Sequence, residues 1–306
     1  MWLLLVLLSW PGVAWSRRHG VEPPGAGAQI TGLFPHLAYE EAYVDFFGGA
    51  NIQKLKNGTY VNISLNKYSG SGFMSREKYY YGFFSAAIKL PSSYTAGVVV
   101  AFYMSNADVF PHTHDEIDFE LLGHEKQKEW VLQTNIYGNG SVSTGREEKF
   151  YLWFDPTEES HEYSILWNYH HTVFLVDNIP VREVNHSDAM SRAYPSKPMS
   201  VYATIWDGSD WATHGGKKPA NYAYAPFVAS FGALEMVGCM WNRTSSAPPC
   251  PRGGQSQRLD LDPVEGPDFV RLSEKQRSGM EWIRGRFMFY SYCRDRARYS
   301  VLPPEC

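Results

Sequence analysis

Apolar and polar residues alternate in short runs along most of the chain between residues 60 and 206. A period of two is typical of β-strands, because successive side chains of a strand point to opposite faces. Glycine, proline and asparagine separate the runs, and residues 66–72 read as a polar loop. So many strands with no helix between them predict an all-β fold, a β-sandwich or jelly roll. The predicted strands are Tyr60–Leu65, Tyr79–Leu90, Gly97–Met104, an acidic run within 114–123, Trp130–Tyr137, Phe150–Phe154, Glu162–Asn168, Thr172–Val176, Val181–Glu183 and Met199–Trp206.

The last part of the chain has a different character. From about Cys239 the composition shifts toward proline, glycine, arginine and cysteine. Residues Ser273–Arg286 predict a helix with Ser273 as its N-cap. We therefore predict a sandwich formed by residues 17–235 and a small disulfide-stapled extension, residues 236–306, packed against it.

All four cysteines lie near the C-terminal end of the sequence. An even number of cysteines suits an oxidising compartment, where disulfides form and persist. Three pairings are possible, and the pairing with the shortest loops joins the first cysteine to the second and the third to the fourth. The absence of a Cys-x-x-Cys motif disfavours a metal-binding role. The cysteines are Cys239, Cys250, Cys293 and Cys306.

The first 16 residues predict a signal peptide. Leu3–Leu8 is an apolar run that is too short to span a membrane, and Ala14-Trp15-Ser16 offers small residues at a cleavage site. No later stretch is long and apolar enough for a span, so we expect a secreted, soluble protein without a membrane partner. Five glycosylation sequons agree with secretion. They are at Asn57, Asn62, Asn139, Asn185 and Asn242.

Composition narrows the functional classes. The 306 residues are 44% hydrophobic and 15% aromatic, enough for one large core. Ten tryptophans and twenty tyrosines exceed what packing usually needs, and stacking against sugar rings is the functional interpretation, although most of them fill the core. The formal net charge of −4, with no basic run, argues against a nucleic-acid partner.

The most informative run is His-Asp-Glu-Ile-Asp-Phe-Glu-Leu-Leu-Gly at residues 114–123. Its alternation places Glu116, Asp118 and Glu120 on one face of a strand. Three adjacent carboxylates repel one another, which separates their pKa values and leaves one protonated beside one ionised. The pattern therefore favours acid–base and nucleophilic catalysis.

Two other interpretations of this run remain open. It could be an acidic face exposed to solvent, with the large apolar partners as the argument against. It could also be a metal site, because the two nearby histidines share the parity of Glu116. The candidate ligands of such a site are His112, His114 and Asp115.

The spacing also predicts a reaction type. Cα atoms four residues apart on a strand are separated by ~13 Å at ~3.3 Å per residue. Glu116 and Glu120 can lean over Asp118 to bring their carboxyl groups to ~5–6 Å, the separation found in retaining glycosidases. An inverting enzyme needs about 6.5–9.5 Å to hold a water molecule.

The run 114–123 resembles the active-site strand of the xyloglucan endotransglucosylase/hydrolases of glycoside hydrolase family 16. The resemblance covers nearly the whole mature chain and implies a concanavalin-like jelly roll as the catalytic domain. The C-terminal sequence Pro303-Pro304-Glu305-Cys306 is similar to the end of the family's four-cysteine extension. Further matching segments are 133–135, 146–147, 152–157, 163–167, 177–182, 206–213 and 225–229.

The resemblance implies a role for each matching residue. Glu116 would be the nucleophile, Glu120 the general acid and base and a substrate contact, and Asp118 the helper acid between them. Arg298 would be a contact of the extension on the acceptor side. The other implied substrate contacts are Gln133, Thr134, Asn135, Gly145, Arg146, Glu147, Asp210, Trp211 and Gly215.

Some of these residues could have a purely structural role instead of contacting substrate. Gln133 and Asn135 could be buried amides that bind the backbone, and Trp211 could fill the core. Arg146 and Glu147 could form an exposed ion pair.

The resemblance further implies a monomer of the cell wall or apoplast that needs no metal or cofactor. Its donor would be xyloglucan, and its acceptor would be water or another xyloglucan chain. Relatives often have Asp or Asn at the position of Gly145, and a sequon where this chain has His124-Glu125-Lys126. The sequon at Asn139 lies further along the chain and is similar in position to the sequon of the family's divergent branch. That branch includes members that mainly hydrolyse xyloglucan. The alternatives are a retaining glucanase for another β-glucan and a non-catalytic lectin.

Overall fold

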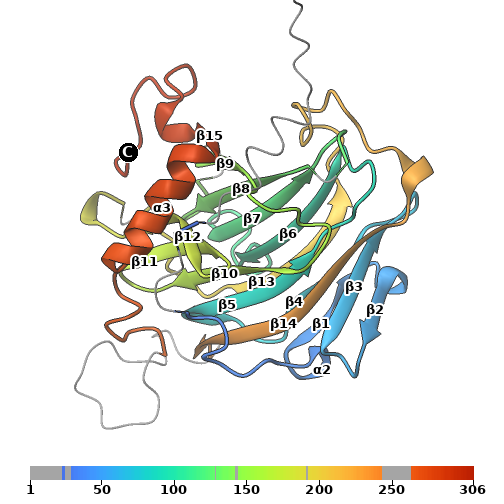
Figure 1. Cartoon of the computed structure of the whole chain (residues 1–306). Helices are drawn as coiled ribbons and strands as arrows, with labels where there is room; N and C mark the ends of the chain where they lie inside the picture. Colours follow the sequence, from blue (N-terminus) through green and yellow to red (C-terminus); the bar gives the residue numbers. More distant parts are fainter. Residues whose placement is uncertain (1–22, 25–28, 128, 142–143, 191, 243–262) are drawn as a thin grey trace, which may run out of the picture.

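The computed structural model describes residues 23–24, 29–127, 129–141, 144–190, 192–242 and 263–306. Two antiparallel sheets pack face to face as a β-sandwich, with one α-helix of the C-terminal extension along one end (Figure 1). The prediction of an all-β sandwich is confirmed. No helix within the described ranges has the length and apolar character needed to cross a membrane.

The first sheet has eight strands and carries the acidic run. In spatial order it contains β1 (Tyr43–Phe47), β4 (Ser71–Ser75), β13 (Ser200–Asp207), β6 (Val98–Ser105), β7 (Glu116–Gly123), β8 (Trp130–Tyr137), β9 (Glu148–Tyr151) and β15 (Met288–Ser291).

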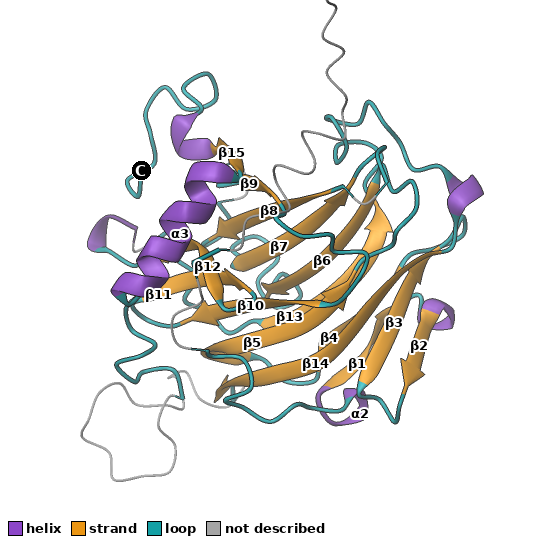
Figure 2. Cartoon of the chain, in the orientation of Figure 1, coloured by secondary structure: helices purple, strands orange, loops and turns teal. Residues whose placement is uncertain are grey.

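The second sheet has seven strands and covers the other side of the core. In spatial order it contains β12 (Ile179–Asn185), β11 (His171–Val176), β10 (His161–Trp167), β5 (Tyr79–Lys89), β14 (Phe227–Met240), β3 (Tyr60–Leu65) and β2 (Ile52–Leu55). Short helical segments connect the strands around the sandwich (Figure 2). They are α2 (Tyr39–Ala42) and 3-10 turns at Gly49–Asn51, Asp188–Met190, Tyr222–Tyr224 and Tyr292–Arg294.

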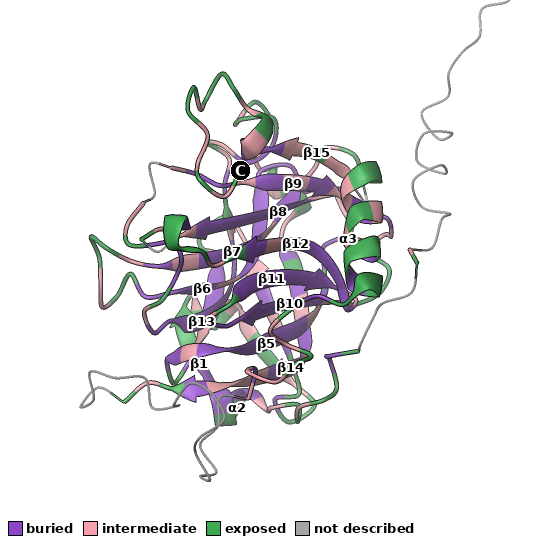
Figure 3. Ribbon diagram, turned by 90° about the vertical axis from the view of Figure 1, so that its left-hand side faces the viewer, coloured by how far each residue is buried: buried purple, intermediate pink, exposed green. Residues whose placement is uncertain are grey.

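The core fills the space between the sheets, where the strands of both are largely buried (Figure 3). Ile117, Phe119 and Leu121 of β7 have no exposed surface. The ring of Phe119 lies edge-on to Phe174 of the opposite sheet, with centroids 5.1 Å apart. The alternating pattern of β7 therefore buries its apolar side chains in the core and leaves its acids on the outer face of the first sheet.

Several strand predictions need correction. β3 and β8 have the predicted bounds, but residues 152–154 leave the sheet after β9, and β4 begins inside the predicted polar loop 66–72. β1, β2, β14 and β15 were not predicted from the sequence. In β14 two register shifts against β5 interrupt the alternation, which removes the period-two signal.

The C-terminal extension is joined to the sandwich through strands as well as by packing. The predicted helix is confirmed as α3 (Glu274–Arg286), and Ser273 caps it together with Gln276. The helix packs on β12, and β15 pairs with β9, so the extension supplies the edge strand of the first sheet. β14 runs past the predicted boundary at residue 235.

One predicted disulfide is confirmed. Cys293 and Cys306 are bonded, with Cα atoms 5.3 Å apart. Cys250 and the signal segment 1–16 lie outside the described residues, so both of those predictions stay predictions.

Four of the five sequon asparagines are exposed, namely Asn57, Asn139, Asn185 and Asn242. Asn62 lies half-buried in β3, where its side chain accepts a hydrogen bond from Ser230. Their glycosylation stays a prediction.

Candidate active site

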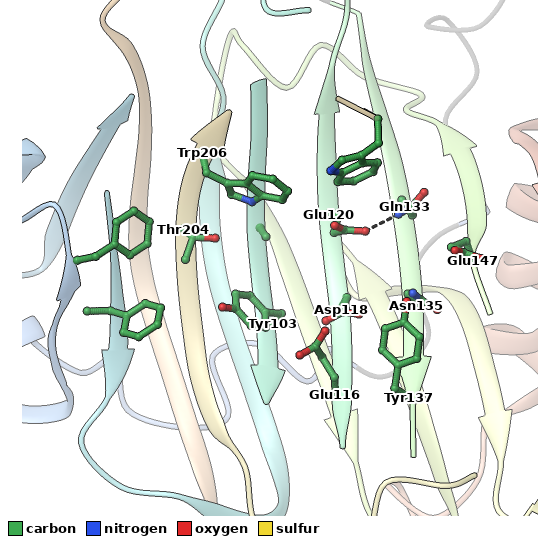
Figure 4. A pocket seen from close by; sticks show the side chains of 14 residues that line it. Tyr103, Glu116, Asp118, Glu120, Gln133, Asn135, Tyr137, Glu147, Thr204 and Trp206 are labelled. Atoms are coloured by element: carbon green, nitrogen blue, oxygen red, sulfur yellow. Dashed lines mark hydrogen bonds between the residues drawn. The ribbon is translucent and has the colours of Figure 1, made fainter. Parts of the chain in front are cut away.

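A cleft of about 470 Å³ lies on the outer face of the first sheet, across β6, β7 and β8. The three carboxylates of β7 point into it side by side (Figure 4). It is lined by Phe46, Phe47, Ala101, Tyr103, Glu116, Asp118, Glu120, Gln133, Asn135, Tyr137, Glu147, Thr204, Trp206 and Trp211.

Strand register arranges the polar side chains in rows across the sheet. Glu120 lies opposite Gln133 of β8, which in turn lies opposite Lys149 of β9. The amide of Gln133 donates a hydrogen bond to a carboxylate oxygen of Glu120. In the next row Asp118 lies opposite Asn135.

Burial and mutual repulsion set the protonation of the three acids. Burial, followed by the charge of Glu116 among smaller contributions, raises the pKa of Glu120 to about 7, although the Gln133 hydrogen bond and Lys149 act in the other direction. Burial and the charges of its two neighbours raise the pKa of Asp118 well above its usual value. Glu120 is therefore protonated in weakly acidic solution, and the protonated form of Asp118 is favoured relative to a free aspartate.

Glu116 differs from the other two acids because no neighbouring carboxylate adds to the rise in its pKa. Burial raises its pKa, but the Ser105 hydroxyl and the charge of His114 oppose that rise. The His114 ring lies 4.0 Å from the Glu116 carboxylate. An ionised Glu116 close to a protonated Glu120 is the pairing of nucleophile and acid that a double displacement needs.

Not every predicted contact reaches the cleft. Thr134 lies opposite Phe119, so the alternation of β8 turns its side chain inward, where its hydroxyl accepts a hydrogen bond from Arg182. Arg146 is also buried, and its guanidinium bonds Glu305 while its backbone amide donates to Asn135. Its side chain therefore supports the cleft wall from behind.

Arg298 of the extension is not among the lining residues, but it binds one of them. The Arg298 guanidinium donates to Glu147 at 2.7 Å, and Glu147 lines the cleft. Gly145 makes room for this pair, because a Cβ there would lie 2.3 Å from the Arg298 guanidinium. A glycine at this position therefore fits the packing around the Arg298–Glu147 pair.

The loop after β13 contributes one predicted residue to the cleft. Trp211 lines it beside Trp206, with ring centroids 5.8 Å apart. Asp210 and Gly215 are exposed on the same loop and are not among the lining residues.

Sequence reasoning missed much of the aromatic wall. Tyr103 stacks on Tyr202 at 4.9 Å, and Phe46 packs edge-on against the same ring at 5.1 Å. Phe46 lies on β1, which has too little alternation to be predicted. Tyr103 lay in a predicted strand that read as buried on both faces, and only its register opposite Asp118 places it in the cleft.

The metal interpretation of the acidic run is not supported. Asp115 accepts hydrogen bonds from the Lys197 ammonium at 2.7 Å and from two backbone amides at 2.8 Å, so its carboxylate is already used to hold a loop. Among the described residues, the cluster with metal-binding geometry lies elsewhere, at His124, Glu125 and His214.

A second buried carboxylate lies on the inner face of the same sheet. Glu148 accepts hydrogen bonds from Arg284 and, at 2.8 Å, from Ser291, and Arg182 approaches to 3.8 Å. Burial alone would raise the pKa of Glu148, but the Arg284 hydrogen bond and the two arginine charges outweigh it and hold the pKa below its usual value.

Two family descriptions match this chain. Residues 40–224 match "Glycosyl hydrolases family 16", and residues 262–306 match "Xyloglucan endo-transglycosylase (XET) C-terminus". The chain is also 52% identical to the probable xyloglucan endotransglucosylase/hydrolase protein 27 of Arabidopsis thaliana, over 89% of this chain and 79% of that protein. The chain belongs to the xyloglucan endotransglucosylase/hydrolases of glycosyl hydrolase family 16.

Other xyloglucan endotransglucosylase/hydrolases show where this chain lies within the family. It is 50% identical to the probable protein 30 of Arabidopsis thaliana, over 88% of this chain and 77% of that protein. It is 42% identical to xyloglucan endotransglucosylase/hydrolase protein 2 of the same plant, over 88% of this chain and 89% of that protein. The chain therefore groups with proteins such as 27 and 30.

Solved structures agree with the family's sandwich. The Bacillus licheniformis β-glucanase matches with a TM-score of 0.52 at 20% identity, over 72% of this chain and 99% of that one. The Crh5 transglycosylase matches with a TM-score of 0.55 at 20% identity, over 71% and 88%. At this identity the similarity shows the fold alone.

Proposed function

We propose that this chain cleaves the β-1,4-glucan backbone of xyloglucan by a retaining, double-displacement mechanism. The observation that carries the proposal is the set of three adjacent carboxylates, Glu116, Asp118 and Glu120, pointing into an aromatic-walled cleft. Membership of the family supports xyloglucan as the donor.

The protonation pattern supports the roles of the acids. Glu120, with a pKa of about 7, holds a proton at the weakly acidic pH of an extracellular wall and is the general acid. Glu116 is the nucleophile, since the Ser105 hydroxyl and the His114 charge oppose the rise that burial causes in its pKa, and no neighbouring carboxylate adds to that rise. Asp118 lies between them in register and, when protonated, can donate a hydrogen bond to either.

The reaction proceeds in two balanced steps. A Glu116 oxygen forms a bond to the anomeric carbon while the glycosidic bond breaks, and the Glu120 proton moves to the leaving oxygen. The ionised Glu120 then takes a proton from the incoming hydroxyl, whose oxygen displaces Glu116 and restores the original configuration. The acceptor hydroxyl belongs either to water or to another xyloglucan chain.

The cleft walls fit a polysaccharide. Trp206, Trp211 and Tyr103 offer flat apolar faces to pyranose rings, while Gln133 and Asn135 offer amides to hydroxyl groups. The family resemblance supports Arg298 as a contact on the acceptor side, and its ion pair with Glu147 joins the extension to the cleft wall.

We further propose that hydrolysis outweighs transfer, since the chain resembles the divergent branch of the family. The choice between acceptors depends on a few kcal/mol of binding on the acceptor side. The predicted signal peptide and the family support secretion as a monomer into the cell wall.

A paired assay tests the proposal. Purified protein is given xyloglucan with and without xyloglucan oligosaccharides, and both reducing ends and oligosaccharide incorporation are measured. Rising reducing ends with little incorporation are expected. Incorporation with few new ends would make the protein mainly a transglucosylase. Inactivity on xyloglucan with activity on another β-glucan would reassign the substrate, and binding without turnover would indicate a lectin.

A further inference from the structure

The chain carries a cluster of two imidazoles and a carboxylate at the end of the active strand. His124 and Glu125 directly follow β7, and His214 comes from the loop after β13. One ligand atom from each of the three lies within 4.8 Å of the others. Their side chains are graded in exposure, from 13% for His124 and 28% for Glu125 to 49% for His214.

The backbone around the cluster is fixed independently of it. The amide and carbonyl of His124 bond to Thr95, at 3.2 and 3.1 Å. The hydroxyl of Thr213 donates to the carbonyl of Gly123 at 2.9 Å and accepts from the Gly97 amide at 2.8 Å. Each histidine therefore adjoins a residue that holds the loop to the end of β7, and the three ligands are largely positioned in advance.

The ligand atoms of this cluster suit a metal ion that accepts both nitrogen and oxygen ligands. Nε2 of His214 lies 3.0 Å from the Glu125 carboxylate, and Nδ1 of His124 lies 3.5 Å from the same group. Glu129 approaches Nδ1 of His124 to 3.7 Å and supplies a second carboxylate beside the cluster. Two imidazoles with one carboxylate, leaving a position for water, is a typical zinc set, whereas calcium and magnesium prefer oxygen ligands alone.

We propose that His124, Glu125 and His214 bind one Zn²⁺ ion, which ties the turn after β7 to the loop that carries Trp211. The ion would bind Nδ1 of His124, Nε2 of His214 and a Glu125 oxygen, displacing the Lys126 amide that now donates to Nδ1 at 3.1 Å.

The site would act on the cleft from outside it. Trp211 lines the cleft and packs in the small apolar cluster that contains Leu122, the residue two before His124. A bound ion therefore links a cleft-lining loop to the strand that carries the acids, at the end occupied by Glu120. The reacting atoms themselves do not touch the proposed site.

A titration tests the site. Mature protein without a polyhistidine tag is stripped with a chelator and titrated with zinc chloride by calorimetry, with calcium and magnesium chloride as comparisons. We expect saturable one-to-one uptake of zinc alone. His214→Asn and Glu125→Gln should each weaken binding beyond the roughly 10–100-fold typical of outer-shell changes.

His170→Asn is the matched control, because His170 is also an exposed histidine beside a glutamate, Glu265, at 3.4 Å. This variant should bind zinc as the unchanged protein does. Equal binding by His214→Asn, or no saturable uptake, would overturn the proposal and leave the cluster as a hydrogen-bonded one.

Two measurements test the geometry. X-ray absorption at the zinc edge should show two imidazole ligands, and any other number would contradict the assignment. Zinc should slow amide hydrogen exchange at residues 208–216 in the unchanged protein and leave His214→Asn unaffected. Exchange that does not respond to zinc would overturn the link between the two loops.

Discussion

Two buried carboxylate sites lie on opposite faces of the same sheet and have opposite electrostatics. On the inner face Glu148 is held by Arg284 and Arg182, and its pKa is lowered. On the cleft face Glu116 and Glu120 have no arginine hydrogen-bonded to them among the described residues, and their pKa values are raised. The inner site holds the extension to the sandwich, because Arg284 belongs to α3.

The difference shows how a structural acid and a reactive acid can be told apart. A carboxylate whose charge is compensated stabilises the fold and stays ionised. A carboxylate that is buried among like charges stores an unfavourable interaction, and this makes a proton available near neutral pH. Four changes test this contrast, and they follow in order of expected size.

The largest effect should come from Glu116→Ala. Loss of the nucleophile should lower xyloglucan turnover by about 10⁴-fold or more, while the free energy of unfolding is unchanged or increases because a repelling acid is gone. Reducing-end assays and urea unfolding measure the two quantities. Near-normal turnover in this variant would contradict the mechanism.

Glu148→Gln should show the reverse pattern in stability. Breaking the buried pair leaves Arg182 and Arg284 without their carboxylate, at an expected cost of about 2–3 kcal/mol in the free energy of unfolding. This cost is below the usual cost of breaking a fully buried pair, because the Arg284 side chain is 30% exposed. Glu116→Gln is the matched substitution on the cleft face, and equal stabilities of the two variants would remove the contrast.

Glu120→Gln should change how stability depends on pH. The folded protein holds the Glu120 proton up to about pH 7, whereas the unfolded chain releases it near 4.5. The folded state therefore binds more protons between these values, and its stability falls as pH rises through this window. Removing the acid should make the variant about 1–2 kcal/mol more stable than the unchanged protein at pH 7.

Unfolding measured at several pH values checks this expectation. The difference in stability between Glu120→Gln and the unchanged protein should disappear near pH 4.5. Glu148 predicts the opposite sign: its lowered pKa gives stability that is lost as pH falls below 4.5. A Glu120→Gln variant with the pH profile of the unchanged protein would mean that Glu120 is not the raised acid.

The smallest effect should come from Lys149→Met. The Lys149 charge lowers the pKa of Glu120, so its removal should move the alkaline limb of kcat/KM upward by about half a pH unit. Lys89→Met removes an equal charge from an exposed position on β5 of the other sheet and should leave the limb in place. A downward shift would contradict the row of Glu120, Gln133 and Lys149.

The most accurate predictions from the sequence depended on local patterns of residues. The face assignment of β7 followed from period two alone, and the large partners Phe119 and Leu121 showed which face is buried. The N-cap at Ser273 likewise depends on side chains within one helical turn. Features set by neighbouring residues were therefore predictable.

Features that depend on pairing between strands distant in the sequence could not be predicted. Thr134 was expected in the cleft because the family resemblance covers the segment 133–135, but its pairing with the buried Phe119 directs it inward. Arg146 was expected on the rim, and its partner Glu305 lies at the far end of the sequence. Phe46 lies on a five-residue edge strand whose place beside the cleft is fixed only by pairing of β1 with β4.

The central position of β14 has a consequence for how the chain is made. β14 pairs with β5 on one side and with β3 on the other, and among the described strands β2 is the edge strand that pairs with β3. At ribosomal rates of ~5–20 residues per second, the partner of β3 emerges on the order of ten seconds or more after β3 itself. During that interval β3 and β5 present unpaired edges, which attract other chains. Gene fragments that stop before residue 240 are therefore expected to aggregate, and the nascent chain is expected to depend on chaperones until β14 has emerged.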